Sequence, residues 1–285
     1  MRRDIQQLSK TAIATDNMKE VLFFLHIPKT AGTTLRNVLY RQYPKQSIFT
    51  IDYRNWPIKA INELTDMNSS EKEELSLVMG HMEYGWHAHF PNSAFTYMTM
   101  LREPVERIIS HYYYERIKGR PFYDLANKYS LSEYLLYSNV NEIDNGLVRF
   151  LSGRLNTTFG NCDRIMLEEA KENISRSNFI LGLTEYFDES LIFYGDRLNW
   201  RKKLFYTRKN TNKDKSHRID EESINVIRET NKYDVELYAY AKRVFLERIS
   251  EIPNFDKKVR NFRRLNYILG LGFPLYKTFK KIVRK

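Results

Sequence analysis

Short apolar runs recur along the chain and alternate with segments of helical spacing. The runs 21–27, 47–51, 75–79, 94–101 and 178–183 have the length and composition of buried strands. Strands that alternate with helices are typical of an α/β fold, so we expect a P-loop-like parallel sheet flanked by helices. Helical patterns are found over 33–40, 57–64, 69–75, 104–117, 131–137, 143–151, 163–174, 188–198 and 220–249.

Composition divides the chain into three parts. Residues 1–20 are polar and are expected to be loosely held. Residues 21–255 carry the strand and helix pattern of one α/β domain, and the whole chain of 285 residues is long enough to bury a sizeable core. Residues 256–285 are expected to form a helical C-terminal extension, interrupted near Gly270 and Gly272.

The first predicted strand leads directly into a turn suited to bind an anion. The free amides at a helix start and the helix dipole attract negative charge, and Lys29 adds a full positive charge. Thr33 or Thr34 is expected to cap the helix. We expect a phosphate to bind at the seven residues of this turn, which are Pro28, Lys29, Thr30, Ala31, Gly32, Thr33 and Thr34.

The order of residues in this turn differs from the phosphate loop of ordinary P-loop kinases. That loop ends in Gly-Lys-Ser/Thr, with the lysine last. Here Lys29 precedes Gly32 and lies at the strand end, which disfavours a kinase of that kind. For this segment alone, a plain strand-turn-helix with a solvated lysine is the alternative.

Two further strand ends carry charged or titratable side chains. His81 follows the third predicted strand, and Arg102 follows the fourth, with Ser110 two turns along the next helix. A guanidinium binds phosphate bidentately, and a hydroxyl can add a further bond. Because ligands bind at the carboxyl ends of parallel strands, Lys29, His81 and Arg102 are expected to meet at one edge. The alternative for Arg102 and Ser110 is a surface arginine and a serine bonded to its own helix.

Two of these segments resemble the nucleotide-binding elements of sulfotransferases. Residues 28–34 resemble the loop that binds the 5′-phosphosulfate of 3′-phosphoadenosine 5′-phosphosulfate (PAPS), and YMTMLREPVERIISHYYY (97–114) resembles the element that binds its 3′-phosphate. The chain is similar to the Golgi-type and bacterial carbohydrate sulfotransferases, a family that includes heparan sulfate 2-O-sulfotransferase. The similarity extends to VMGHMEYG (78–85), DNGLVRFLSG (144–153), FILGLTEYFDESL (179–191) and NKYDVELYAYAKRVF (231–245).

The resemblance implies an enzyme that moves the sulfuryl group of PAPS to a hydroxyl of a glycan or polysaccharide. It implies that Arg102 and Ser110 bind the 3′-phosphate and that Lys29 neutralises the oxygen that leaves sulfur. His81 matches the family's histidine base, and an imidazole is suited to accept a proton near neutral pH. The alternative for His81 is a histidine hydrogen-bonded within its loop.

The resemblance also implies a segment that closes over the nucleotide. Lys209 and Asn210 lie in a basic stretch that matches this segment, although a solvated flexible loop is equally compatible with the sequence.

Five polar residues are candidates for contact with the acceptor: Glu83, His87, His89, Asn145 and Arg149. A His-x-His pair on a strand suits Zn²⁺, but only Glu83 lies nearby to complete a site, so no metal is expected. His87 and His89 are expected to be structural or to face the substrate. Asn145 and Arg149 are four residues apart and share one face of a predicted helix.

The net charge of +11 is concentrated at the C-terminus. Residues 257–285 contain ten Lys or Arg and no Asp or Glu. Such a segment can lie on an anionic membrane surface, or it can pack on the domain with a solvated charged face. Because the rest of the chain is nearly neutral, nucleic acid is not an expected partner.

Cysteine content and the absence of an apolar leader bear on localisation, and the anion-binding turn and the basic tail each suggest a rival function. A single cysteine, Cys162, and the lack of an apolar leader or membrane anchor predict a cytoplasmic enzyme, with the tail at the inner membrane face. The rival functions are an ATP-dependent phosphotransferase that uses the same turn and a non-catalytic polyanion-binding protein that uses the basic tail. Neither the acceptor nor the oligomeric state is encoded in a recognisable motif.

Overall fold

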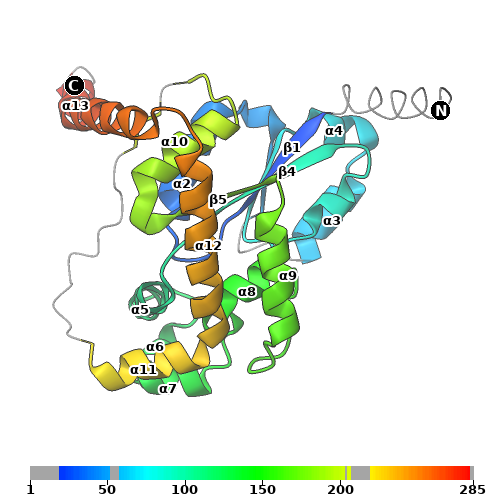
Figure 1. Ribbon diagram of the computed structural model, residues 1–285, viewed down its shortest axis with the longest axis vertical. Helices are drawn as coiled ribbons and strands as arrows, with labels where there is room; N and C mark the ends of the chain where they lie inside the picture. The colour runs from blue at the N-terminus through cyan, green and yellow to red at the C-terminus, as the bar shows by residue number, and fades with distance from the viewer. Residues whose placement is uncertain (1–18, 52–57, 203, 207–218, 283–285) are drawn as a thin grey trace.

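The core of the structure is a parallel sheet with the order β2-β3-β1-β4-β5 (Figure 1). The computed structural model describes residues 19–51, 58–202, 204–206 and 219–282, with side chains described as far as residue 268. All four pairings between neighbouring strands are parallel, which confirms the predicted fold class. The strands are β1 (Glu20–Leu25), β2 (Ile48–Ile51), β3 (Leu77–Gly80), β4 (Ala94–Leu101) and β5 (Phe179–Leu183).

Burial on both faces explains why the strands are recognisable as apolar runs. Every residue of β3 and β5 is buried, and β1 is buried from its second residue onward. The predicted β4 has the observed bounds, whereas β3 begins two residues later than predicted. Leu75 instead is the C-cap residue of helix α4 (Ser69–Glu74), and the backbone amide of Ser76 donates to the carbonyl of Ser47.

Helices surround the sheet, and several of them pack together in one layer. In Figure 1, α8, α9 and α12 lie side by side, while α6, α7 and α11 form a group near α5. The helices are α2 (Gly32–Gln42), α3 (Ile58–Asp66), α4 (Ser69–Glu74), α5 (Pro104–Glu115), α6 (Tyr123–Lys128), α7 (Leu131–Tyr137), α8 (Gly146–Ser152), α9 (Arg164–Ser175), α10 (Phe187–Arg197), α11 (Glu221–Thr230), α12 (Lys232–Ser250) and α13 (Phe255–Ile282). Helix α6 has no counterpart among the sequence-based predictions.

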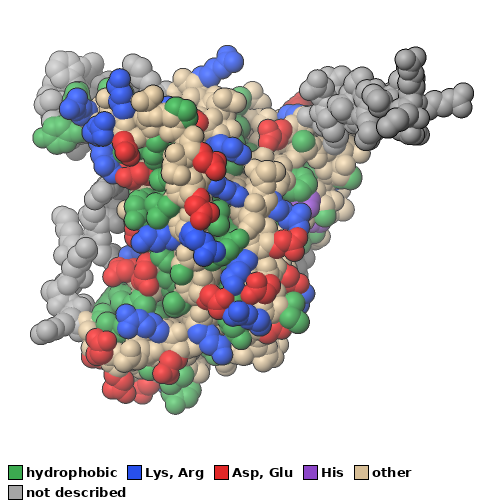
Figure 2. Space-filling model, viewed as in Figure 1, with side chains coloured by type: hydrophobic (Ala, Val, Ile, Leu, Met, Phe, Trp, Pro, Cys, Tyr) green, Lys and Arg blue, Asp and Glu red, His purple; other side chains and the backbone are tan. Residues whose placement is uncertain are grey.

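The C-terminal helix differs from the expectation of an interrupted tail. Helix α13 continues through both of its glycines without a break. Phe255, Val259 and Phe262 are buried in the main core, so the first turns of the tail pack on the domain. Basic side chains gather over these turns (Figure 2), and among them Arg263 pairs with Asp188 and Glu189 of α10. Contact of 257–285 with a membrane surface stays a prediction. Among the described residues, no helix combines the length and apolar character needed to span a membrane.

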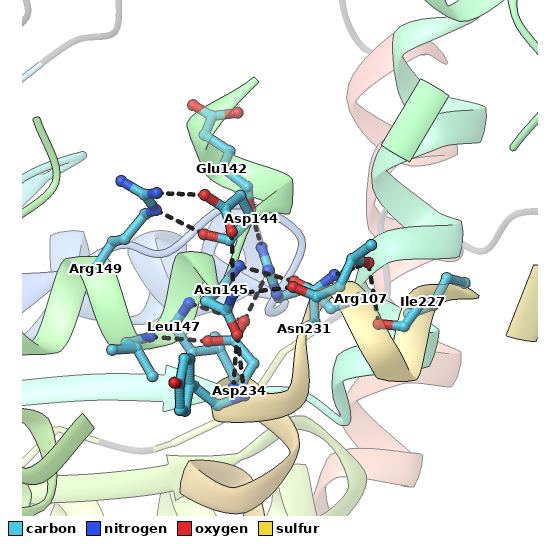
Figure 3. A network of polar contacts seen from close by, with 12 residues as sticks. Arg107, Glu142, Asp144, Asn145, Leu147, Arg149, Ile227, Asn231 and Asp234 are labelled. Carbon is cyan, nitrogen blue, oxygen red and sulfur yellow. Dashed lines mark hydrogen bonds and ion pairs between the residues drawn. The ribbon is translucent and has the colours of Figure 1, made fainter. Parts of the chain in front are cut away.

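A buried polar network joins α5, α8 and α12 (Figure 3). The Asp234 carboxylate accepts from Arg107 Nη2 at 3.1 Å and from the backbone amides of Leu147 and Val148 at 3.0 and 2.9 Å. The side chains of Arg107 and Asp234 are both fully buried. Burial raises the pKa of Asp234, and Arg107 and the two amides oppose that shift. The carboxylate therefore caps α8 and fixes α5 at the same time.

We expect Asp234→Ala to destabilise the protein strongly, because it leaves the Arg107 guanidinium and two amides buried without their acceptor. Removing one partner of a buried ion pair costs about 3–5 kcal/mol. The free energy of unfolding, measured by chemical denaturation, tests this expectation. Arg263→Ala is the control, since its exposed pairs on α10 are worth roughly 1 kcal/mol or less. Equal losses for the two variants would contradict the role given to the network.

Candidate active site

The turn after β1 has an unusual backbone. Lys29 and Ala31 have φ angles of 68° and 62°, in the left-handed region that non-glycine residues rarely adopt. The Thr30 hydroxyl donates to the carbonyl of Ile27 at 2.8 Å and is buried. Each left-handed residue costs of order 1–3 kcal/mol, so the surrounding packing must hold this shape. Such strain is typical of functional sites.

Helix α2 begins earlier than predicted. It starts at Gly32 with Ala31 as its N-cap, so the expectation that Thr33 or Thr34 caps the helix is wrong. Both threonines lie inside the first turn. Ala31 has no side-chain oxygen and forms no side-chain capping bond, which leaves the first amides of α2 available to an anion.

Three cationic side chains surround this turn. The Lys29 ammonium lies 3.5 Å from the ring centroid of Tyr114, and the Arg120 guanidinium lies 3.8 Å from the same centroid. Arg102 Nη1 is 3.4 Å from the carbonyl oxygen of Lys29. Burial, followed by the positive charge of Arg102, lowers the pKa of Lys29 to about 8. Only the charge of Glu115 shifts that pKa in the opposite direction.

Helix α5 presents the predicted serine on the face that bears these cations. Glu106, Ser110 and Tyr114 are four residues apart in turn, so they lie along one side of α5. Glu106 pairs with Arg102 at 3.1 Å, and Tyr114 contacts Lys29. Ser110 lies between these two contacts. The structure therefore brings the residues predicted for the two phosphates to one place.

His81 follows β3 at the same edge of the sheet. Its ring stacks on the ring of His26, with centroids 4.4 Å apart and planes 23° apart. The amide of His26 donates to the carbonyl of Gly80 at 2.9 Å, which holds the ends of β1 and β3 together. A pocket opens beside the two imidazoles, with Arg36 of α2 and Thr50 of β2 also in its lining. Because β1, β3 and β4 are parallel neighbours, Lys29, His81 and Arg102 all follow strand ends at this edge of the sheet.

Three site residues were missed at the sequence level, and each leaves at most a weak signal. His26 closes an apolar strand and therefore looks like one more strand residue. Tyr114 is four residues beyond Ser110, and this spacing is the one signal that points to it. Arg120 follows α5 and reaches the turn only through the fold.

The structure places His87 and His89 away from this edge and gives Glu83 a backbone partner. His87 and His89 lie in a short 3₁₀ helix, not on a strand, and His87 Nδ1 is 2.9 Å from the Tyr97 hydroxyl. The His87 ring stacks on Phe95, which is about 20 Å along β4 from the strand end. Glu83 accepts from the amide of Leu155 at 2.6 Å. These contacts are structural.

Asn145 and Arg149 belong to the buried network rather than to an open site (Figure 3). Asn145 directly precedes α8, and its backbone amide donates to Asn231 Oδ1 at 2.9 Å. Arg149 is fully buried, pairs with Asp144 and donates to the carbonyl of Thr158 at 3.1 Å. We therefore assign both to the packing of α8, which corrects their candidacy for acceptor contact.

Two expectations remain, the segment that closes over the nucleotide and the metal content of the site. Lys209 and Asn210 lie outside the described residues. Within the described part of the chain, no group of three or more His, Cys, Asp or Glu side chains has a metal-binding arrangement.

Comparison with known families agrees with this geometry. The model of the galactose-3-O-sulfotransferase family matches residues 6–269. The chain belongs to this family. The resemblance drawn from the nucleotide-binding segments is thereby confirmed.

The relatives of this sulfotransferase family member include two kinds of heparan sulfate enzyme. Heparan-sulfate 6-O-sulfotransferase 2 of Danio rerio is 25% identical over 296 residues, covering 86% of this chain and 62% of that protein. Heparan sulfate 2-O-sulfotransferase 1 of Gallus gallus is 22% identical over 188 residues, covering 60% and 53%. The chain thus spans less than two thirds of the length of these relatives. Among solved structures, mouse sulfotransferase SULT7A1 complexed with PAP aligns with a TM-score of 0.40 and 12% identity, over 78% of this chain and 69% of that chain.

The pKa of Lys29, at about 8, predicts a pH dependence of anion binding. As pH rises through this value the ammonium loses its proton, so we expect affinity for adenosine 3′,5′-bisphosphate to fall between about pH 7 and pH 9. Calorimetric titrations at several pH values measure this fall. In Lys29→Arg the charge does not titrate, and the fall should disappear. An equal decline in both proteins would show that another group is responsible.

Proposed function

We propose that this protein is a sulfotransferase that uses PAPS as donor and a sugar hydroxyl of a glycan as acceptor. The observation that carries the proposal is the contact between Lys29 and Arg102, which come from separate strand ends about 70 residues apart in the sequence. Family membership supports the reaction class. The names of the heparan sulfate relatives support a carbohydrate acceptor.

The donor is proposed to lie across the two cationic elements. Residues 28–34 receive its 5′-phosphosulfate, where the amides of α2 and the Lys29 ammonium supply positive charge. Arg102 and Ser110 receive its 3′-phosphate, since a guanidinium and a hydroxyl suit this anion. A PAPS molecule carries several negative charges, which would relieve the mutual repulsion of the cations.

The transfer is proposed to be a single in-line displacement. His81 accepts the proton of the acceptor hydroxyl as that oxygen forms a bond to sulfur. The bond between sulfur and the bridging phosphate oxygen breaks, and adenosine 3′,5′-bisphosphate leaves with the electron pair. Lys29 stabilises the charge that develops on this oxygen, as cations do in phosphoryl transfer. The acceptor would enter through the pocket beside His26 and His81.

We expect His81→Ala to keep the fold and the affinity for adenosine 3′,5′-bisphosphate but to lose transfer by at least about 100-fold, because no base remains for the hydroxyl proton. The measurement is transfer of ³⁵S-labelled sulfate from PAPS to a panel of glycans. His89→Ala, in the 3₁₀ helix at the other end of the sheet, is the matched control and should keep activity. Normal transfer by His81→Ala would exclude it as the base.

We expect Arg102→Ala to act mainly on donor binding. Losing a charge-assisted bond costs about 1.5–3 kcal/mol, or roughly 10- to 150-fold in the dissociation constant. Calorimetry with adenosine 3′,5′-bisphosphate measures this dissociation constant. Arg176→Ala is the control and should leave it unchanged, because Arg176 pairs with Glu172 on the surface of α9.

Thermal shift distinguishes the proposed sulfotransferase from the ATP-dependent phosphotransferase by the nucleotide that stabilises the protein more. Adenosine 3′,5′-bisphosphate should raise the melting temperature of the wild type more than ATP with Mg²⁺ does. A larger shift with ATP-Mg²⁺ would favour the phosphotransferase alternative.

A further inference from the structure

His26 is the residue at the proposed active site for which the transfer just described has no task. It closes the apolar run of β1 and follows Leu25 directly. Its ring lies between two others: the Phe24 ring at 5.7 Å and an interplanar angle of 11°, and the His81 ring at 4.4 Å and 23°. The three flat rings form one stack at the end of the sheet.

The backbone around this stack leaves the His26 ring little freedom. A Cβ atom at position 32 would lie 1.9 Å from Cδ2 of His26, so Gly32 is required for the ring to occupy its place. The His26 amide is bonded to the carbonyl of Gly80, the residue directly before His81. Ring and backbone of His26 therefore both contact the segment that positions His81.

The charges around the stack favour a neutral His26. Burial, followed by the positive charges of His81, Arg36 and Lys29, lowers the pKa of His26 well below its ordinary value. The negative group near the pair is Glu142. Burial favours its neutral form, but the hydrogen bond with His111 and the charges of His111 and His81 hold its pKa below the usual range.

We propose that His26 is a positioning residue: its flat ring, for which Gly32 leaves room, stacks on His81 and sets the plane in which the His81 ring meets the acceptor hydroxyl. This inference rests on the proposed function, since it assigns a support to the proposed base. The proton still moves from the acceptor to His81, and His26 exchanges none. A flat neutral side chain is the property that matters, not a titratable one.

Two substitutions at this position separate shape from chemistry. His26→Phe keeps a flat ring without a titrating nitrogen, whereas His26→Gln keeps polarity without a ring. We expect His26→Phe to retain most of the turnover. We expect His26→Gln to lose about 10- to 100-fold in kcat, the scale on which a misplaced catalytic group acts. Both variants should bind adenosine 3′,5′-bisphosphate as the wild type does.

A spectroscopic reading tests the stack without any sulfate transfer. A ring stacked on His81 shifts the Hε1 proton of His81 upfield, and NMR of histidine-labelled full-length protein detects this shift; His81→Ala assigns the signal. The shift should be present in the wild type and in His26→Phe and absent from His26→Gln. Unchanged turnover in His26→Gln, or equal losses in both variants, would overturn the inference. If the wild type itself transfers no sulfate to any acceptor, the proposed function fails, and absence of the wild-type shift would still refute the stack.

Discussion

Mutual repulsion among cations at one sheet edge is the constraint on which the rest of the site depends. Lys29 and Arg102 are in contact, and Arg120 shares the ring of Tyr114 with Lys29. Like charges gathered in a partly buried place are unfavourable unless something offsets them, and here burial first and the charges of Arg102 and Arg120 after it lower the pKa of Lys29. The left-handed backbone at Lys29 and Ala31 adds strain at the same place. A bound polyanion would relieve the electrostatic part of this cost.

The fold maintains this arrangement from the opposite side of α5. Arg107 lies five residues beyond Arg102 on the chain and is held by Asp234 of α12, and both side chains of this pair are fully buried. Glu142 joins this network because its backbone carbonyl accepts from Arg107, and its carboxylate bonds His111. The helix that carries Ser110 and Tyr114 is therefore fixed by buried polar contacts on one face, while Glu106 and Tyr114 on its other face contact the cations.

The parallel sheet itself could be predicted because β1, β3, β4 and β5 are buried over most of their length, and continuous apolar runs mark such strands clearly. The edge cluster could be predicted because parallel strands end together, so Lys29, His81 and Arg102 had to meet. The contacts that the sequence does not reveal are long-range. The distant partners of Asn145 lie 85 to 89 positions away, at the end of α11, between the two helices and on α12, and nothing in its helical spacing with Arg149 indicates them. Of the two roles expected for His87 and His89, the structural one agrees with their contacts, because their loop leaves the strand-end edge and returns to the start of β4.

A crystal structure of the full chain with adenosine 3′,5′-bisphosphate tests the central claim most directly. The account predicts the 5′-phosphate at the amides of 28–34 beside Lys29, and the 3′-phosphate between Arg102 and Ser110. A nucleotide bound elsewhere, or one whose phosphates leave Lys29 and Arg102 without contact, would contradict it.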